Sequence, residues 1–311
     1  MSRATARGYR VAFLAEVTQG TTPTTAPTLL RTTGGGMSVA ASSVESEEVQ
    51  LVEVPDVIRT NVEGTGTINF EYSYGGIHPL LEGLFASTWT TNVLRVGSTL
   101  RTFTIEDQFT DISRFLTARG CIIESISITL QQGSKITGTV TYRALTPPTA
   151  FATATVFGAA PNAAPTNPIM SPVGSVQLIQ EAGSLNLGPA GIGTLGMTIN
   201  MTRQGIAMPQ VGTTALAGLD QGTFVCTGTL SLYVPVGATA IIDKYLSDTA
   251  TQLALTLGGA STLRDAYLFS NVRFTEGGIG EMSRNSPANL NLSWQALASS
   301  PNTTVQITRT P

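Results

Sequence analysis

The strongest constraint on the fold is an alternation of apolar and polar residues with a period of two. In residues 67–72, TINFEY, the side chains of Ile68, Phe70 and Tyr72 share one face, and polar side chains share the other. The same pattern recurs in SISITLQ (125–131), KITGTVTYR (135–143), TLGMTINMT (194–202), TGTLSLYV (227–234) and NLNLSWQ (289–295). Because successive side chains of a β-strand point to opposite faces, the pattern predicts half-buried antiparallel strands.

Two segments carry a helix-like pattern instead, at residues 77–86 and 238–246. Pro79 falls in the first turn of the former, where proline is tolerated. Glycine (32 residues) and proline (16 residues) separate short runs throughout the chain, which is typical of all-β proteins. We therefore predict an all-β dominated fold, a β-sandwich or antiparallel sheets, with one short helix in each half.

The two halves of the chain repeat the same order of elements. GTI at 66–68 aligns with GTL at 228–230, and the strand that begins at Ser125 aligns with one that begins at Asn271. Residues 90–111 of the first half have no counterpart and are expected to form an inserted hairpin. The repeat predicts a tandem duplication of one module.

This duplication divides the chain into three parts. The first module is expected at 1–145, with an N-terminal arm and a loop at 42–61, and the second module at 173–311. Residues 146–172 between them are rich in Pro, Ala and Thr, and they are expected to form a linker.

Few charges are available for binding nucleic acid or membranes. Charged residues make up 12% of the chain, the net charge is −3, and Lys135 and Lys244 are the only lysines. Sequence-independent binding of nucleic acid relies on many cations along the phosphates, so we expect none. No apolar run reaches the ~18 residues of a transmembrane helix, and Glu16 interrupts any signal-peptide core. We expect a cytoplasmic product that binds no membrane.

No constellation of residues indicates catalysis, a metal or a cofactor. His78 is the only histidine, which excludes a histidine-based triad within one chain, and we expect it to cap a helix. GIGTLG at 191–196 fits the dinucleotide fingerprint, but an alternating strand follows it, so a glycine-rich turn is expected. Cys121 and Cys226 are expected to be buried thiols. We predict that the protein is not an enzyme.

The polar faces of the predicted strands carry mainly Thr, Ser, Asn and Gln instead of Lys and Glu. One interpretation is the solvent-facing surface of a Thr-rich β-sandwich. Another is the lining of an interior passage, which must be wet without holding a polyanion. Closing the sheets of several subunits into one barrel would also remove exposed strand edges.

The first half resembles the tail tube proteins of long flexible-tailed, siphovirus-type bacteriophages. The resemblance covers about residues 9–145, with YRVAFLAEVTQGTTPTTAPTLLRTTG at 9–34 and the stretch from SEEVQLVEV to FTDI at 46–112. The second half resembles the family more weakly, through GTFVCTGTLSLYV, the predicted helix AIIDKYL and the strands up to Trp294.

The resemblance implies a β-sandwich with a flanking helix, whose strands join those of neighbouring subunits into rings. The rings would stack into the tail tube of the virion, a conduit for DNA ejection. With the module doubled, three chains would supply six modules, so we favour a homotrimer with pseudo-sixfold symmetry over a hexamer. The expected partners are further copies of the chain, the tail terminator, tail tip and tape measure proteins, and phage DNA that passes without specific binding.

The residues with a role would then be structural. The candidate lumen face consists of Thr67, Asn69, Glu71, Thr137, Thr139, Thr141, Thr227, Thr229 and Ser231. The candidate inter-ring loop carries Glu45, Glu47, Glu48, Glu53, Asp56 and Arg59, in a spacing that fits no EF-hand. Arg59 is expected to pair with carboxylates of the adjoining ring. A register shift of one residue would exchange the two faces of a strand.

Two other classes of protein remain open at this point. A capsid decoration protein, or another β-rich virion protein, would assemble without enclosing a channel. A carbohydrate-binding β-sandwich would need exposed aromatic residues, and the chain has 6% aromatic residues with Trp89 and Trp294 as its only tryptophans.

Overall fold

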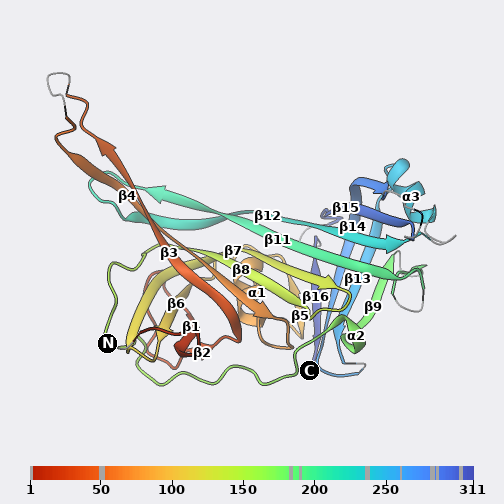
Figure 1. The fold of residues 1–311 in the computed structure, drawn as a ribbon, viewed down its shortest axis with the longest axis horizontal. Coiled ribbons are helices and arrows are strands. Elements are labelled where there is room, and N and C mark those ends of the chain that lie inside the picture. The colour runs from red at the N-terminus through yellow and green to blue at the C-terminus, as the bar shows by residue number, and fades with distance from the viewer. Residues whose placement is uncertain are drawn as a thin grey trace.

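The computed structural model describes residues 3–48, 53–181, 185–188, 191–234, 239–259, 261–280, 284, 287–300 and 304–311. In these residues, sixteen strands join in one hydrogen-bonded sheet network with a few short helices beside it (Figure 1). The pairs between named strands are antiparallel. The predicted all-β fold class is therefore confirmed.

The first half contains a 3-10 turn (Ala6–Gly8), eight strands and one helix. These are β1 (Tyr9–Ala15), β2 (Thr28–Leu29), β3 (Thr32–Glu45), β4 (Val57–Glu71), α1 (His78–Phe85), β5 (Val93–Arg95), β6 (Phe103–Phe109), β7 (Arg114–Gln131) and β8 (Thr137–Ala144). The second half contains α2 (Pro172–Ser175), β9 (Val176–Glu181), β10 (Leu185–Asn186), β11 (Thr194–Pro209), β12 (Leu216–Tyr233), α3 (Thr239–Leu246), β13 (Thr251–Gly258), β14 (Arg264–Ile279), β15 (Asn289–Ala296) and β16 (Gln306–Thr310).

The strands of the two halves pair in the same order. In the first half, the order is β2-β1-β6-β7-β8-β4-β3, and in the second half it is β10-β9-β13-β14-β15-β12-β11. Each long hairpin, β3–β4 or β11–β12, is followed by its half's eight-residue helix, as the sequence predicted. Of the predicted helix at 238–246, residue 238 lies outside the described residues.

The registers of the two halves also agree. Gly36 lies opposite Thr67 in the β3–β4 pair, and Thr198 lies opposite Thr229 in the β11–β12 pair. A bulge interrupts β7 between Ile123 and Ser125, and a bulge interrupts β14 between Phe274 and Glu276.

These bulges correct the sequence alignment of the two halves. They place Ser125 at the position of Glu276, because both residues directly follow the bulge. The sequence alignment had matched Ser125 with Asn271, which lies before the bulge. Period-two alternation does not reveal such a slip, because strand repeats match at many offsets.

The halves are joined strand to strand. Residues 125–131 of β7 pair with residues 196–202 of β11, so that Ile128 lies opposite Ile199. This junction links four strands of each half into one sheet in the order β3-β4-β8-β7-β11-β12-β15-β14. Each chain therefore carries an eight-stranded sheet with β3 at one end and β14 at the other.

Residues 90–111 do not form the predicted inserted hairpin. Strand β5 pairs with β16 of the other half, whereas β6 pairs with β1 and β7. In the second half, β13 pairs with β9 and β14 in the same way, so β6 has a counterpart after all. The alignment missed it because β6 and β13 share little sequence.

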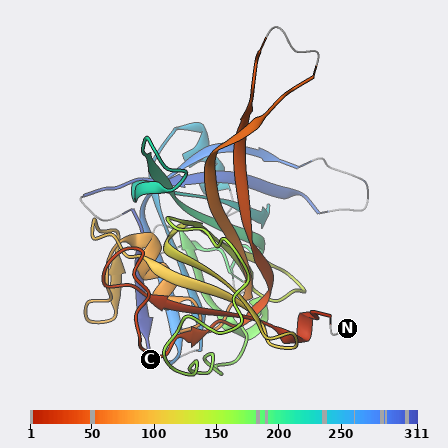
Figure 2. The ribbon, with the colours of Figure 1, turned by 90° about the vertical axis from the view of Figure 1, so that its left-hand side faces the viewer.

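The hairpin β3–β4 projects from the body as a long arm (Figures 1 and 2). The predicted loop at 42–61 is shorter than expected, because β3 continues to Glu45 and β4 begins at Val57. Residues 146–172, the predicted linker, run back along the first half: Ala152 bonds to Phe115 and Asn162 to Leu29.

A buried polar cluster holds the halves together beneath the sheet. Asp265 of β14 is fully buried and accepts a hydrogen bond from the Tyr72 hydroxyl at 2.7 Å, while its other oxygen lies 2.9 Å from His78 Nε2. The Tyr72 hydroxyl also lies 2.7 Å from that of Tyr267. His78 is thus a buried partner of Asp265, and the predicted capping role is wrong: Ile77 is the N-cap of α1 and makes no side-chain cap bond.

Replacing Asp265 by Asn should lower the free energy of unfolding by about 2 kcal/mol or more, because a neutral amide weakens both hydrogen bonds to the buried carboxylate. Asp248→Asn is the matched control, since Asp248 is exposed and pairs with Arg273 at 2.6 Å. It should cost less than about 1 kcal/mol. Chemical denaturation measures both values, and equal effects would contradict the role of the cluster.

Candidate functional site

One face of the eight-stranded sheet is polar and accessible along its whole width. The nine residues proposed for a lumen face all lie on this face, and each is exposed or half-buried. They are Thr67, Asn69 and Glu71 of β4, Thr137, Thr139 and Thr141 of β8, and Thr227, Thr229 and Ser231 of β12. The sequence therefore identified one continuous surface, which we call the polar face.

The polar face crosses the junction between the halves in unbroken rows. Cross-strand pairing aligns one row of six side chains from β4 to β15: Asn69, Thr139, Ser127, Asn200, Thr227 and Gln295. A second row contains Glu71, Thr137, Thr129, Thr198, Thr229 and Ser293. Both halves thus build a single surface of hydroxyls and amides.

Hydrogen bonds between neighbouring side chains order this surface. Thr139 Oγ1 donates to Asn69 Oδ1 at 2.9 Å, and the hydroxyls of Thr198 and Thr229 lie 2.7 Å apart. Ser231 Oγ donates to Asn291 Oδ1 at 2.7 Å. These hydrogen bonds between short side chains occupy groups that would otherwise be free to bind a solute.

The charges on the polar face are few and mostly paired. Lys135 Nζ lies 2.5 Å from Glu71 Oε1, and Arg143 lies 3.0 Å from Glu124. Glu276, in line with Ser293, adds a negative charge near the β14 edge. The surface therefore presents no cluster of cations to a polyanion.

Sequence reasoning missed the part of the polar face that β7 and β11 contribute. The prediction used only the apolar residues of TLGMTINMT, and its polar residues Thr198, Asn200 and Thr202 were not proposed for the site. The same alternation carried the signal, but the pairing of β11 with β7 was needed to place these residues beside Ser127.

The opposite face of the sheet forms the core. Seven side chains that alternate with the polar face are at most 3% exposed: Ile68, Phe70, Val140, Tyr142, Leu230, Leu232 and Trp294. Helix α1 buries Leu80, Leu81, Leu84 and Phe85 in the same core. The predicted orientation of these strands is confirmed by this burial.

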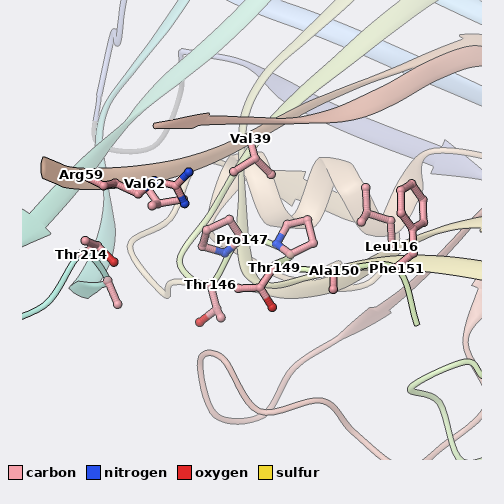
Figure 3. Close-up of a pocket in the computed structure, with 12 residues that line it drawn as sticks. Val39, Arg59, Val62, Leu116, Thr146, Pro147, Thr149, Ala150, Phe151 and Thr214 are labelled. Atoms are coloured by element: carbon pink, nitrogen blue, oxygen red, sulfur yellow. The ribbon is translucent and has the colours of Figure 1, made fainter. Parts of the chain in front are cut away.

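The residues of the candidate inter-ring loop lie on the arm. Glu45, Glu47, Glu48, Glu53, Asp56 and Arg59 are all exposed, and residues 49–52 lie outside the described residues. Arg59 points into a cleft at the base of the arm (Figure 3). The cleft is about 520 Å³ and lies between the arm, residues 146–151 and residues 214–215. Among the described residues that line this cleft, Arg59 alone is charged.

The other candidate features of the described residues indicate no further functional site. No group of three or more His, Cys, Asp or Glu side chains is arranged for a metal there. Residues 191–193 form a turn that leads into β11, as predicted, and Cys121 and Cys226 are buried free thiols whose pKa is raised by desolvation. No helix in this part of the chain is long and apolar enough to cross a membrane.

One buried carboxylate lies behind the arm. Asp107 of β6 is 2% exposed, and it accepts hydrogen bonds from the Tyr9 hydroxyl and the Met37 backbone N–H, each at 3.0 Å. Burial raises the pKa of Asp107 to about 6, although these two hydrogen bonds oppose the shift. The Met37 N–H belongs to β3, so a side chain satisfies an amide at the end of the sheet.

Comparison with known families agrees with this geometry. A family model described as phage tail tube protein matches residues 8–305. No curated protein matched the sequence in a further comparison.

Asp107→Asn should stabilise the unassembled chain at pH 8, because the wild-type carboxyl is ionised there at a cost set by its raised pKa. Stability of the wild type should fall as pH rises from about 4, the pKa in the unfolded chain, to about 6. The variant should therefore be more stable by at most about 3 kcal/mol at pH 8 and equal near pH 3. Urea denaturation across this range measures the difference, with exposed Asp56→Asn as control. A stability difference between Asp107→Asn and the wild type that does not change with pH would contradict the raised pKa of Asp107.

Proposed function

The chain belongs to the phage tail tube protein family, and on this premise we propose that its polar face lines the tail tube as a conduit for DNA ejection. Membership makes the protein a structural component of the virion tail that assembles with copies of itself. The finer picture is supported most directly by one observation, the eight-stranded sheet with one polar and one apolar face.

The proposed ring contains three chains. The identical strand order and registers of the two halves support a tandem duplication, with the modules at 1–145 and 173–311 and the linker between them. Each chain already joins two modules through β7 and β11. Three chains joined in the same way would close a barrel of six modules with pseudo-sixfold symmetry.

The dimensions of such a barrel suit a DNA duplex. Three eight-stranded sheets give twenty-four strands, which at ~4.8 Å spacing and ~40° tilt make a barrel roughly 48 Å across. Side chains reduce the free bore to roughly 35–40 Å. A duplex whose grooves are about 8 Å deep would pass through this bore.

The chemistry of the polar face suits passage without binding. Retention of DNA requires cations that replace counterions along the phosphates. The proposed wall offers hydroxyls and amides that bond to one another, and Lys135 is paired with Glu71. DNA would therefore slide along a hydrated and slightly acidic surface.

The arm provides a means of stacking rings. Its exposed apolar residues Val44, Val57 and Ile58 and its acidic residues project from the body. We assign the outer part of the arm, with Val44, Val57 and Ile58, to contacts with the adjoining ring, and the two ends of the tube to the tail terminator, tail tip and tape measure proteins. Assembly of these parts would take place in the host cytoplasm.

The mass of an isolated ring tests the stoichiometry. Native mass spectrometry should give three times the chain mass of 32.5 kDa, because each chain supplies two modules. Electron microscopy of the same sample should show hollow rings or filaments. A mass of six chains would contradict the trimer, and assemblies without a channel would contradict the conduit.

A double substitution, Thr139→Lys with Thr229→Lys, should leave folding intact and slow DNA ejection, because it places cations on the proposed wall in both modules. Thr139→Ser with Thr229→Ser is the neutral control and should eject at the wild-type rate. Ejection from assembled particles, followed by dye release or light scattering, measures the rate. Unchanged ejection with the lysines present would show that this face does not line the bore.

A further inference from the structure

We infer that the junction between the halves is a template, residue by residue, for the contact between neighbouring chains in a ring. The inference rests on the proposed ring and names the surfaces that close it: the β3 edge with the cleft of Figure 3 on one chain, and β14 with α3 on the next. The occupant of the cleft is therefore a second copy of this chain.

The two ends of the eight-stranded sheet are open in the single chain. Among the described residues, β3 pairs with β4 alone, and residues 276–279 of β14 pair on one side with β15. The Met37 N–H on β3 is held by the Asp107 carboxylate instead of by a strand. An unpaired strand edge is a template for pairing with another chain.

The open edges have the same positions in their modules as the strands that form the internal junction. Residues 34–40 of β3 correspond to residues 196–202 of β11, because both segments pair with their neighbours in the same register. Residues 276–279 of β14 correspond to residues 125–128 of β7, because both follow the shared bulge. The open edges of β3 and β14 are therefore the counterparts of the two strand edges that pair at the internal junction.

This correspondence fixes the register between chains. Ile199 lies opposite Ile128 at the internal junction, so Met37 lies opposite Ile279 of the partner subunit. Asn200 lies opposite Ser127, so Ser38 lies opposite the partner's Gly278. The partner strand takes the Met37 N–H in place of Asp107.

Exposed apolar residues mark the surfaces that the contact would bury. Ile199 and Ile128 are fully buried at the internal junction. By contrast, Ile279 is 49% exposed in the single chain, and Val39, on the same side of β3 as Met37, is 43% exposed.

The correspondence between the halves also includes helices α1 and α3 and the residues of the cleft. At the internal junction, Phe85, the last residue of α1, packs on Phe224 with ring centroids 5.1 Å apart. Leu246 is the last residue of α3, and Val62 of the cleft occupies the position of Phe224. Leu246 is 73% exposed in the single chain, because the surface that covers it belongs to another subunit.

Arg59, which lines the cleft, also has a counterpart at the internal junction. Its counterpart Gln221 donates from Nε2 to the carbonyls of Gly83 in α1 and Ile123 in β7, both at 3.1 Å. Arg59 would donate in the same way to carbonyls at the C-terminal end of the partner's α3, where the helix dipole favours a cation. This assigns Arg59 to a contact within the ring, and not to the adjoining ring as the sequence suggested.

A disulfide tests the register. Ser38→Cys with Gly278→Cys should cross-link assembled rings into covalent trimers on oxidation, because side chains directly opposite each other lie within disulfide reach. A Cβ at Gly278 meets no atom within 4 Å, and the native thiols are buried. The control pair Ser38→Cys with Gly280→Cys is diagonal, roughly 7–8 Å apart, and should not cross-link efficiently.

Non-reducing electrophoresis and electron microscopy of the same samples separate the outcomes. Rings with a disulfide between positions 38 and 278 support the template. Rings without this link, or with the diagonal link favoured, overturn the register and leave the proposed tube intact. Absence of rings from the wild-type protein would overturn the proposed function and the template with it.

Substitution of the exposed leucine tests the helix contact without perturbing the core. Leu246→Ser should raise the protein concentration needed for ring formation by roughly tenfold or more, because the leucine becomes buried only in the ring. Val17→Ser is the control, since Val17 is 98% exposed and lies outside the proposed contact. Circular dichroism should show both variants folded. Equal assembly of both variants would overturn the contact of α3.

Discussion

The fold depends on one requirement, that the backbone groups at the edge of a strand must find partners. In this chain β7 and β11 satisfy each other over residues 125–131 and 196–202, and this pairing turns two four-stranded sheets into one. The polar face, the continuous core and the buried Asp265 cluster all depend on the register that this pair sets. Among the described residues, no second strand pairs with the outer edge of β3 or with that of residues 276–279 of β14, and the proposed association of copies starts from these two edges.

The polar face shows how a sheet can be hydrated and still offer few groups for binding. A solvent-facing sheet usually carries charged side chains, which repel other edges and interact with ions. Here short hydroxyl and amide side chains bond to each other across strands, as Thr198 does with Thr229. Such a surface is hydrated and offers few groups to a polyanion, a combination that suits a passage better than a binding site.

Much of this could be predicted from the sequence, because alternation is a local signal. It gave the strands β4, β7, β8, β11, β12 and β15 with the nine polar-face residues, a helix-like pattern gave α1 and α3, and the resemblance to tail tube proteins was borne out by the family match. Non-local features could not be predicted in this way. The pairing of His78 with Asp265 joins residues far apart in the chain, and the correct alignment of the halves depends on the bulges before Ser125 and Glu276, which only the strand pairing reveals.

The two halves differ at the corresponding contact surfaces, one of which forms within a chain while the other is proposed to form between chains. The junction of β7 with β11 forms as one chain folds, so it can use the large apolar pair Phe85 and Phe224. The surfaces of the proposed contact between chains would have to stay in water until assembly, which fits their smaller or more polar side chains: Leu246, Val62, and Arg59 in place of Gln221. Asp107 fits the same logic, because the matching position in the second half is the buried Leu255. In the free chain the Asp107 carboxylate satisfies the Met37 amide of the β3 edge, and in the proposed ring it would release this amide to a strand that supplies a full ladder.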